Sequence, residues 1–174
     1  MTTAVLVLLG LVALAGLFLT LRGERRPVVA GGAVALVGAL AVAAVLSWLG
    51  EQVGEGALQA GAVLAVLAAV GGGGPVATAV LHAADPAAAG VSGGPQDPDI
   101  LRGGAWIGVL ERAALAVALL VGWPEGLAVI LAVKGLGRFS ELRAPAAAER
   151  FIVGTLASAL WAAACVGVAV LLRG

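Results

Sequence analysis

Residues 104–117 read GAWIGVLERAALAV, residues 125–142 read EGLAVILAVKGLGRFSEL and residues 148–158 read AERFIVGTLAS. These three stretches are apolar enough to lie in a bilayer, and yet each of them carries ionisable side chains. An ionisable group at the centre of a membrane helix costs about 2.5–3.5 kcal/mol on insertion scales. A chain keeps such groups where they pair with each other, face water or bind something. We therefore look for function in this region.

The composition of the whole chain indicates an integral membrane protein. Hydrophobic residues make up 61% of the 174 residues and charged residues only 11%, with a mean hydropathy of +1.11. Soluble domains carry about 25% charged residues. The apolar runs recur along the whole chain, so burial in lipid explains them better than one soluble core does. The net charge of zero argues against a nucleic-acid partner, which would require a basic face.

The apolar runs predict an all-α fold, a polytopic transmembrane helix bundle of about six spans. Residues 1–84 form a predicted N-terminal three-span half, residues 85–103 a cytoplasmic linker, and residues 104–174 a C-terminal three-span half that carries the charged cluster. Gly71–Gly74 and Pro75 lie inside the third span, and they predict that it is kinked or broken at 71–75. A helix that ends near Val70, followed by a short surface helix, is the alternative.

The distribution of basic residues predicts the orientation of the chain. With six spans and both termini outside (N-out/C-out), nine of the ten basic residues fall on the cytoplasmic side, and only Arg173 falls outside. The first apolar run follows no basic residue, which favours a retained transmembrane helix over a cleaved signal peptide. We therefore expect a multi-pass membrane protein. The richness in alanine, glycine and valine is typical of a high-GC bacterial genome, and on that ground we expect it in the bacterial inner membrane.

Helical spacing predicts which charged side chains can meet. Lys134, Arg138 and Glu141 lie at i, i+4 and i+7, on one face of the fifth span. By depth, Glu111 of the fourth span can pair with Lys134, and Glu149 of the sixth span can pair with Arg112 or Arg138. Small residues and hydroxyls around these positions favour close contact between helices. We take these residues as the candidate site, which is either a ligand-binding cluster or a structural charge cluster. Its members are Glu111, Arg112, Lys134, Arg138, Glu141, Glu149, Arg150, Thr155 and Ser158.

Three interpretations of this cluster remain open. A structural network of ion pairs predicts a dry cluster in which every charge is paired. A basic pocket for an anionic lipid or another phosphate-bearing ligand predicts a lateral opening beside Arg112 and Arg138. A small oligomeric transporter or channel, using Glu111 and Lys134 in ion or proton coupling, predicts a cavity between the cluster and the Gly71–Pro75 segment. The lipid-binding interpretation leads, with membrane lipids as partners and homo-oligomerisation left open.

The same stretches carry a resemblance to a family of bacterial integral membrane proteins of unassigned activity. The family patterns are GxxIGxLER, AAKSxxRFxEL and AEYFLIGTLLS, and the similarity covers about residues 102–160. The chain departs from these patterns at Arg150, where the family has tyrosine, and at Gly135, where it has serine. The resemblance implies that the charged residues of this region matter, and it names no role for them.

Other chemistry finds little support in the sequence. His82 is the only histidine and Cys165 the only cysteine, so we expect no metal site, no cofactor and no disulfide. No serine has a histidine at a suggestive position, and we identify no catalytic residues. We therefore expect a non-enzymatic protein. A membrane enzyme that acts on a lipid phosphate is the last alternative.

Overall fold

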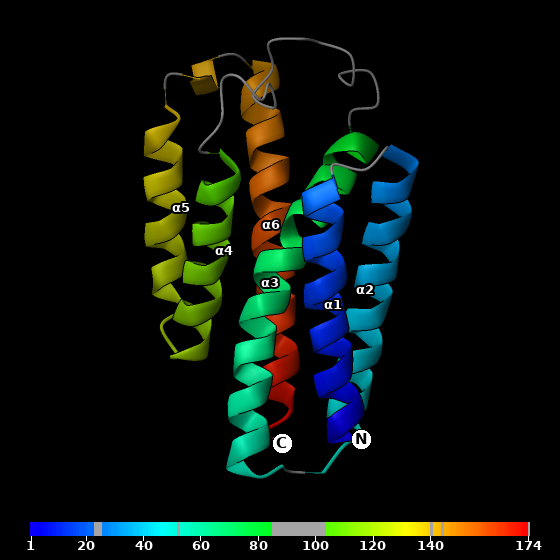
Figure 1. The fold of residues 1–174 in the computed structure, drawn as a ribbon. Coiled ribbons are helices and arrows are strands. Elements are labelled where there is room, and N and C mark those ends of the chain that lie inside the picture. The colour runs from blue at the N-terminus through cyan, green and yellow to red at the C-terminus, as the bar shows by residue number, and fades with distance from the viewer. Residues whose placement is uncertain (23–25, 52, 85–103, 140, 144, 174) are drawn as a thin grey trace.

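The computed structural model describes residues 1–22, 26–51, 53–84, 104–139, 141–143 and 145–173. Within these residues the fold is an all-α bundle (Figure 1). Its elements are α1 (Thr2–Arg22), α2 (Arg26–Trp48), α3 (Glu55–Ala84), α4 (Gly104–Leu120), α5 (Glu125–Gly137), the short 3₁₀ helix η2 (Glu141–Arg143) and α6 (Pro145–Leu171). The predicted linker, 85–103, lies outside the described residues.

Four helices are long and apolar enough to cross a membrane. They cover Thr2–Leu21, Pro27–Trp48, Glu55–Ala84 and Pro145–Leu171, with mean hydropathies between 1.9 and 2.8. Large hydrophobic side chains are exposed on the outer faces of the bundle, as Val34 of α2 and Leu160 of α6 illustrate. Exposed apolar surface on that scale suits lipid and not water. By length and composition the chain is a multi-pass membrane protein.

The remaining two α-helices, α4 and α5, are shorter and form a hairpin. They contain 17 and 13 residues, against 21 to 30 residues in the other four. Figure 1 shows that the turn of this hairpin lies above the lower ends of α1, α2, α3 and α6. The described part of the chain thus contains six α-helices, but only four of them are candidate spans, against the six spans that the sequence predicts. The hairpin, which was expected to supply the fourth and fifth spans, does not reach as far down as the four long helices.

Helices α3 and α6 form the centre of the bundle. α3 packs against α1, α2, α4 and α6, whereas α5 packs closely on α4 only. The buried core draws on Val5 and Leu9 of α1, Leu36 of α2, and Trp161 and Cys165 of α6. Of the residues described in α5, only Gly126 is buried. The hairpin is therefore attached to the bundle through α4, and α5 stands at its edge.

The predicted break in the third span is wrong, because α3 runs as one helix from Glu55 to Ala84 with Pro75 inside it. Gly71, Gly72, Gly73 and Pro75 are buried, so neighbouring helices cover the weak part of α3. Figure 1 shows α3 changing direction near its middle, which agrees with the predicted kink. The alternative, a helix that ends near Val70, is also wrong. We call Gly71–Gly74 the glycine segment.

The path of the chain brings the start of α1 and the end of α6 to the same side of the bundle. The marks N and C in Figure 1 both lie at the lower end of the bundle. The last residues of α1, α3 and α5 lie at the opposite end, together with η2. The side opposite the termini therefore carries four arginines at or beside helix ends, which are Arg22, Arg26, Arg138 and Arg143.

Candidate functional site

An ion pair inside the bundle joins α4 to α5. Lys134 Nζ donates to Glu111 Oε2 at 2.5 Å, so the pair that the spacing predicts is present. The side chains are 21% exposed for Lys134 and 13% for Glu111. Lys134 Nζ also lies 5.9 Å from the centre of the Phe151 ring of α6, within the range of a cation–π contact. These partners hold the ammonium group between α4, α5 and α6.

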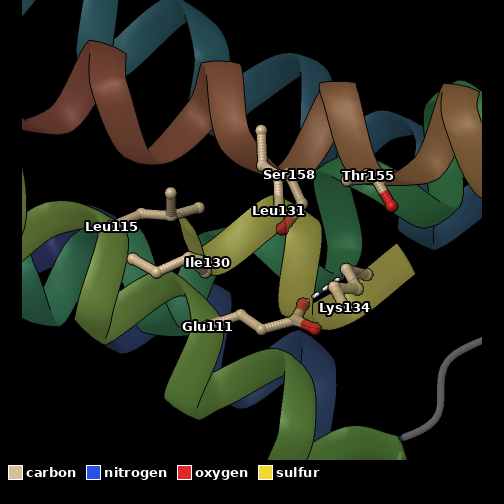
Figure 2. Close-up of a pocket in the computed structure, with 7 residues that line it drawn as sticks. All are labelled: Glu111, Leu115, Ile130, Leu131, Lys134, Thr155 and Ser158. Atoms are coloured by element: carbon tan, nitrogen blue, oxygen red, sulfur yellow. Dashed lines mark hydrogen bonds and ion pairs between the residues drawn. The ribbon is translucent and has the colours of Figure 1, made fainter. Parts of the chain in front are cut away.

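A small pocket lies beside this ion pair, between the hairpin and α6. Thr155 and Ser158 line it from α6, and Glu111 and Lys134 line it from the hairpin (Figure 2). Its cavity volume is about 10 Å³, which is room for about one water molecule. We call this gap between the α4–α5 hairpin and α6 the polar seam. The residues that line it are Glu111, Leu115, Ile130, Leu131, Lys134, Thr155 and Ser158.

Arg112 does not belong to the polar seam, although it follows Glu111 in the sequence. Its side chain is only 8% exposed and extends toward α3, where Nε donates to the carbonyl oxygen of Val70 at 3.2 Å. The guanidinium group also lies beside Gly108 of its own helix. The predicted Arg112–Glu149 pair is therefore wrong, because the Arg112 side chain is held against Val70 and Gly73 of α3. Glu149 is exposed.

Arg112 is one of three side chains that bring hydrogen-bond donors to the middle of α3. Trp161 Nε1 donates to the Ala68 carbonyl at 3.1 Å. The Thr20 hydroxyl, which donates to the Gly16 carbonyl of its own helix at 2.9 Å, also lies 3.4 Å from the Gly71 carbonyl oxygen. Pro75 has no N–H to donate to that Gly71 carbonyl, four residues earlier. Donors from α1, α4 and α6 therefore supply partners for the backbone where α3 is weakest.

The glycine segment also permits very close helix contacts. A Cβ atom on Gly16 of α1 would lie 2.5 Å from backbone atoms of Gly72, and one on Gly72 would lie 2.5 Å from the Trp161 ring. A side chain at Gly73 would collide with Arg112. Only glycine fits these positions. The transporter interpretation predicts a cavity between the glycine segment and the charged cluster. Between Gly73 and Arg112 there is direct contact instead of a cavity.

The other predicted site residues lie toward the end of the bundle opposite the termini. Arg138 caps the C-terminus of α5, where its backbone N–H donates to the Gly135 carbonyl and the Phe139 N–H donates to the Leu136 carbonyl, each at 3.3 Å. Glu141 begins η2. Arg150 lies in α6 and is half-buried. Together with Lys134 they come from consecutive elements, α5, η2 and α6. The cluster is thus divided between the polar seam and the end of the bundle, with Arg112 apart from both.

Sequence reasoning missed two of the residues that hold α3. Thr20 is a lone hydroxyl in an apolar run, and Trp161 lies far from either end of α6. Both are polar groups at membrane depth, where an interhelical hydrogen bond is the usual reason for their presence. That signal was available in the sequence, although the partner carbonyls were not.

Comparisons with protein-family models, with curated proteins and with solved structures find no match for this chain. Among the described residues, no three histidine, cysteine, aspartate or glutamate side chains are grouped as a metal ion would need.

Proposed function

We propose that this chain is a multi-pass protein of the bacterial inner membrane that binds an anionic lipid, or another phosphate-bearing ligand, at the mouth of the polar seam. The resemblance of residues 102–160 to a family of bacterial membrane proteins is part of this proposal. The observation that carries it is Lys134: an ammonium group fixed by Glu111 and Phe151 at the edge of α5, where that helix is not packed closely on α6.

The arrangement of helix ends supports the orientation that such a site requires. Arg22, Arg26, Arg138 and Arg143 lie on the side opposite the termini, and Arg173 lies on the side of the termini. Basic residues gather on the cytoplasmic side of membrane proteins. The polar seam then opens toward the cytoplasmic leaflet, with both termini outside.

The size of the pocket restricts the ligand to its mouth. A cavity of about 10 Å³ holds about one water molecule and not a phosphate group. Glu111 neutralises Lys134 in the observed state, so a phosphate must compete with this carboxylate. Apart from the Glu111–Lys134 pair, residues 138–150 contain three arginines and two glutamates, which are Arg138, Arg143, Arg150, Glu141 and Glu149. This surplus attracts an anionic headgroup.

Native mass spectrometry of the protein in mild detergent tests the proposal. Wild type is titrated with an anionic glycerophospholipid or with inorganic phosphate, beside Lys134→Met and the matched control Arg173→Met at the other end of the bundle. We expect Lys134→Met to weaken lipid binding about fivefold, because one basic group near a headgroup contributes about 1 kcal/mol. Arg173→Met should bind like wild type. Equal binding by all three proteins would refute a site at Lys134.

A second function, ion or proton coupling, is favoured by one observation. The pocket brings a carboxylate, an ammonium group and two hydroxyl-bearing side chains around a space of about one water molecule, and such groups can relay a proton. Reconstituted vesicles with a trapped pH indicator would test it. Glu111→Gln should abolish a proton flux that wild type shows. If wild type moves no protons under an imposed gradient, this candidate is excluded and the binding proposal is unaffected.

A further inference from the structure

Helix α5, the second helix of the α4–α5 hairpin, is too short to cross the hydrocarbon layer beside the four long helices, and α4 with 17 residues is shorter than any of those four. At 1.5 Å per residue, the 13 residues of α5 extend about 20 Å, whereas the hydrocarbon core is about 30 Å thick. α1, with 21 residues, extends about 32 Å and matches that thickness. Figure 1 shows the same difference, because the hairpin turn ends above the lower ends of the long helices.

The tip of this hairpin is exposed and carries a carboxylate. Residues 121–125, Val-Gly-Trp-Pro-Glu, are all exposed. Gly122 adopts a φ of 76°, and the turn closes through the bond from Trp123 N–H to the Ala118 carbonyl at 2.8 Å. The tip therefore combines irregular backbone with the charge of Glu125. Irregular backbone at membrane depth is tolerated only where protein covers it or water reaches it, and a carboxylate in lipid is costly.

We infer that α4–α5 is a re-entrant hairpin that turns inside the membrane at Gly122–Pro124, and that water from the side of the termini reaches its tip. The exposure of all five tip residues means that other parts of the described chain do not cover them. Water satisfies both the turn backbone and Glu125. This inference concerns the face of the membrane opposite the polar seam, and it holds whatever the seam binds.

The re-entrant geometry leaves a thin barrier between that water and the polar seam. Along α5, only about one helical turn separates Gly126 from Ile130, which lines the pocket beside Glu111 and Lys134. One turn corresponds to about 5.4 Å. Leu127 and Ile130 are partly buried against the core and form the apolar part of this barrier.

Cysteine labelling in sealed membrane vesicles tests the water access. Glu125→Cys is compared with Leu49→Cys, just beyond the end of α2 on the side of the termini, and with Val117→Cys, an exposed apolar position of α4. The native Cys165 is buried and gives the background. With a membrane-impermeant maleimide we expect positions 49 and 125 to react from the same side, at rates within about tenfold, and position 117 not to react, because thiolate chemistry requires water.

A nitroxide attached at the same cysteines measures depth and separates a re-entrant hairpin from a spanning one. We expect the label at 125 to lie about 10 Å deeper than the label at 49, given the helix lengths. An unreactive thiol at position 125 would overturn the inference, because the tip would then be dry. Equal depths at 49 and 125 would also overturn it, because the hairpin would then span. Trp123→Cys repeats both measurements if Glu125→Cys does not fold.

Discussion

The glycine segment of α3 and the polar seam beside α5 both place polar groups inside the bundle, at very different packing densities. Around the glycine segment, neighbouring helices approach so closely that no Cβ atom fits at Gly71, Gly72 or Gly73. At the polar seam, α5 lacks close contact with α6, and a water-sized pocket remains beside Lys134. Dense packing suits a structural role, and a loosely packed charged seam suits ligand exchange. Substitutions that separate stability from binding test this contrast.

The largest effect is expected from a side chain placed in the glycine segment. Gly72→Leu forces atoms into the space of the Trp161 ring, which is fixed by its bond to the Ala68 carbonyl. Overpacking of this kind typically costs about 1–3 kcal/mol, and we expect a value at the upper end here because the ring is held in place. The matched control is Gly38→Leu in α2, since nothing lies within 4 Å of a Cβ atom there. Thermal unfolding in detergent should show a large loss for Gly72→Leu and almost none for Gly38→Leu; similar midpoints would contradict the packing described for α3.

A smaller loss of stability is expected from Arg112→Ala. The change removes the hydrogen bond to the Val70 carbonyl and the packing of the side chain on Gly73, at a cost of about 2 kcal/mol. The unfolding midpoint in detergent measures this loss. Arg112→Lys should not restore stability fully, because lysine lacks the Nε donor. Lipid binding per folded molecule should change less than in Lys134→Met. If Arg112→Ala loses lipid binding and keeps its stability, then the structural role assigned to the glycine segment and the binding role assigned to the polar seam are wrong.

A substitution in the Glu111–Lys134 ion pair is expected to increase the affinity for lipid. Glu111→Gln leaves Lys134 without its competing carboxylate, so the affinity for an anionic headgroup should increase about fivefold, equivalent to about 1 kcal/mol. Stability should change by less than about 1 kcal/mol, because the pair is partly exposed. The same lipid titration by native mass spectrometry measures the affinity. A weaker affinity in Glu111→Gln would mean that Glu111 itself contacts the ligand or that Lys134 needs it for position.

Much of the fold could be predicted from the sequence, because each long apolar run has one outcome in a bilayer. Residues 1–84, predicted to hold three spans, fold as α1, α2 and α3, and α3 ends at Ala84. The expected break at 71–75 failed for a physical reason. Glycine and proline propensities describe an isolated helix in water, whereas Thr20, Arg112 and Trp161 support α3 from three neighbours.

The candidate site was predictable only where two helices meet in register. The Glu111–Lys134 pair follows from depth along α4 and α5, which share a short turn. The direction of Arg112 depends on which face of α4 packs on α3, and that packing depends on the glycine segment, which is distant in the sequence. Long-range packing of this kind has no local signal.

The smallest effect is expected at Gly135, on the loosely packed side of the comparison. Nothing lies within 4 Å of a Cβ atom at Gly135, so Gly135→Ala adds no collision and should stabilise α5 by up to about 1 kcal/mol through helix propensity. A slightly higher unfolding midpoint with unchanged lipid affinity is the expected result. A loss of stability would show that α5 packs on something at this position. A larger side chain at Gly72 is expected to destabilise the protein. Whether Gly135→Ala raises or lowers the unfolding midpoint therefore shows whether the two regions differ in packing.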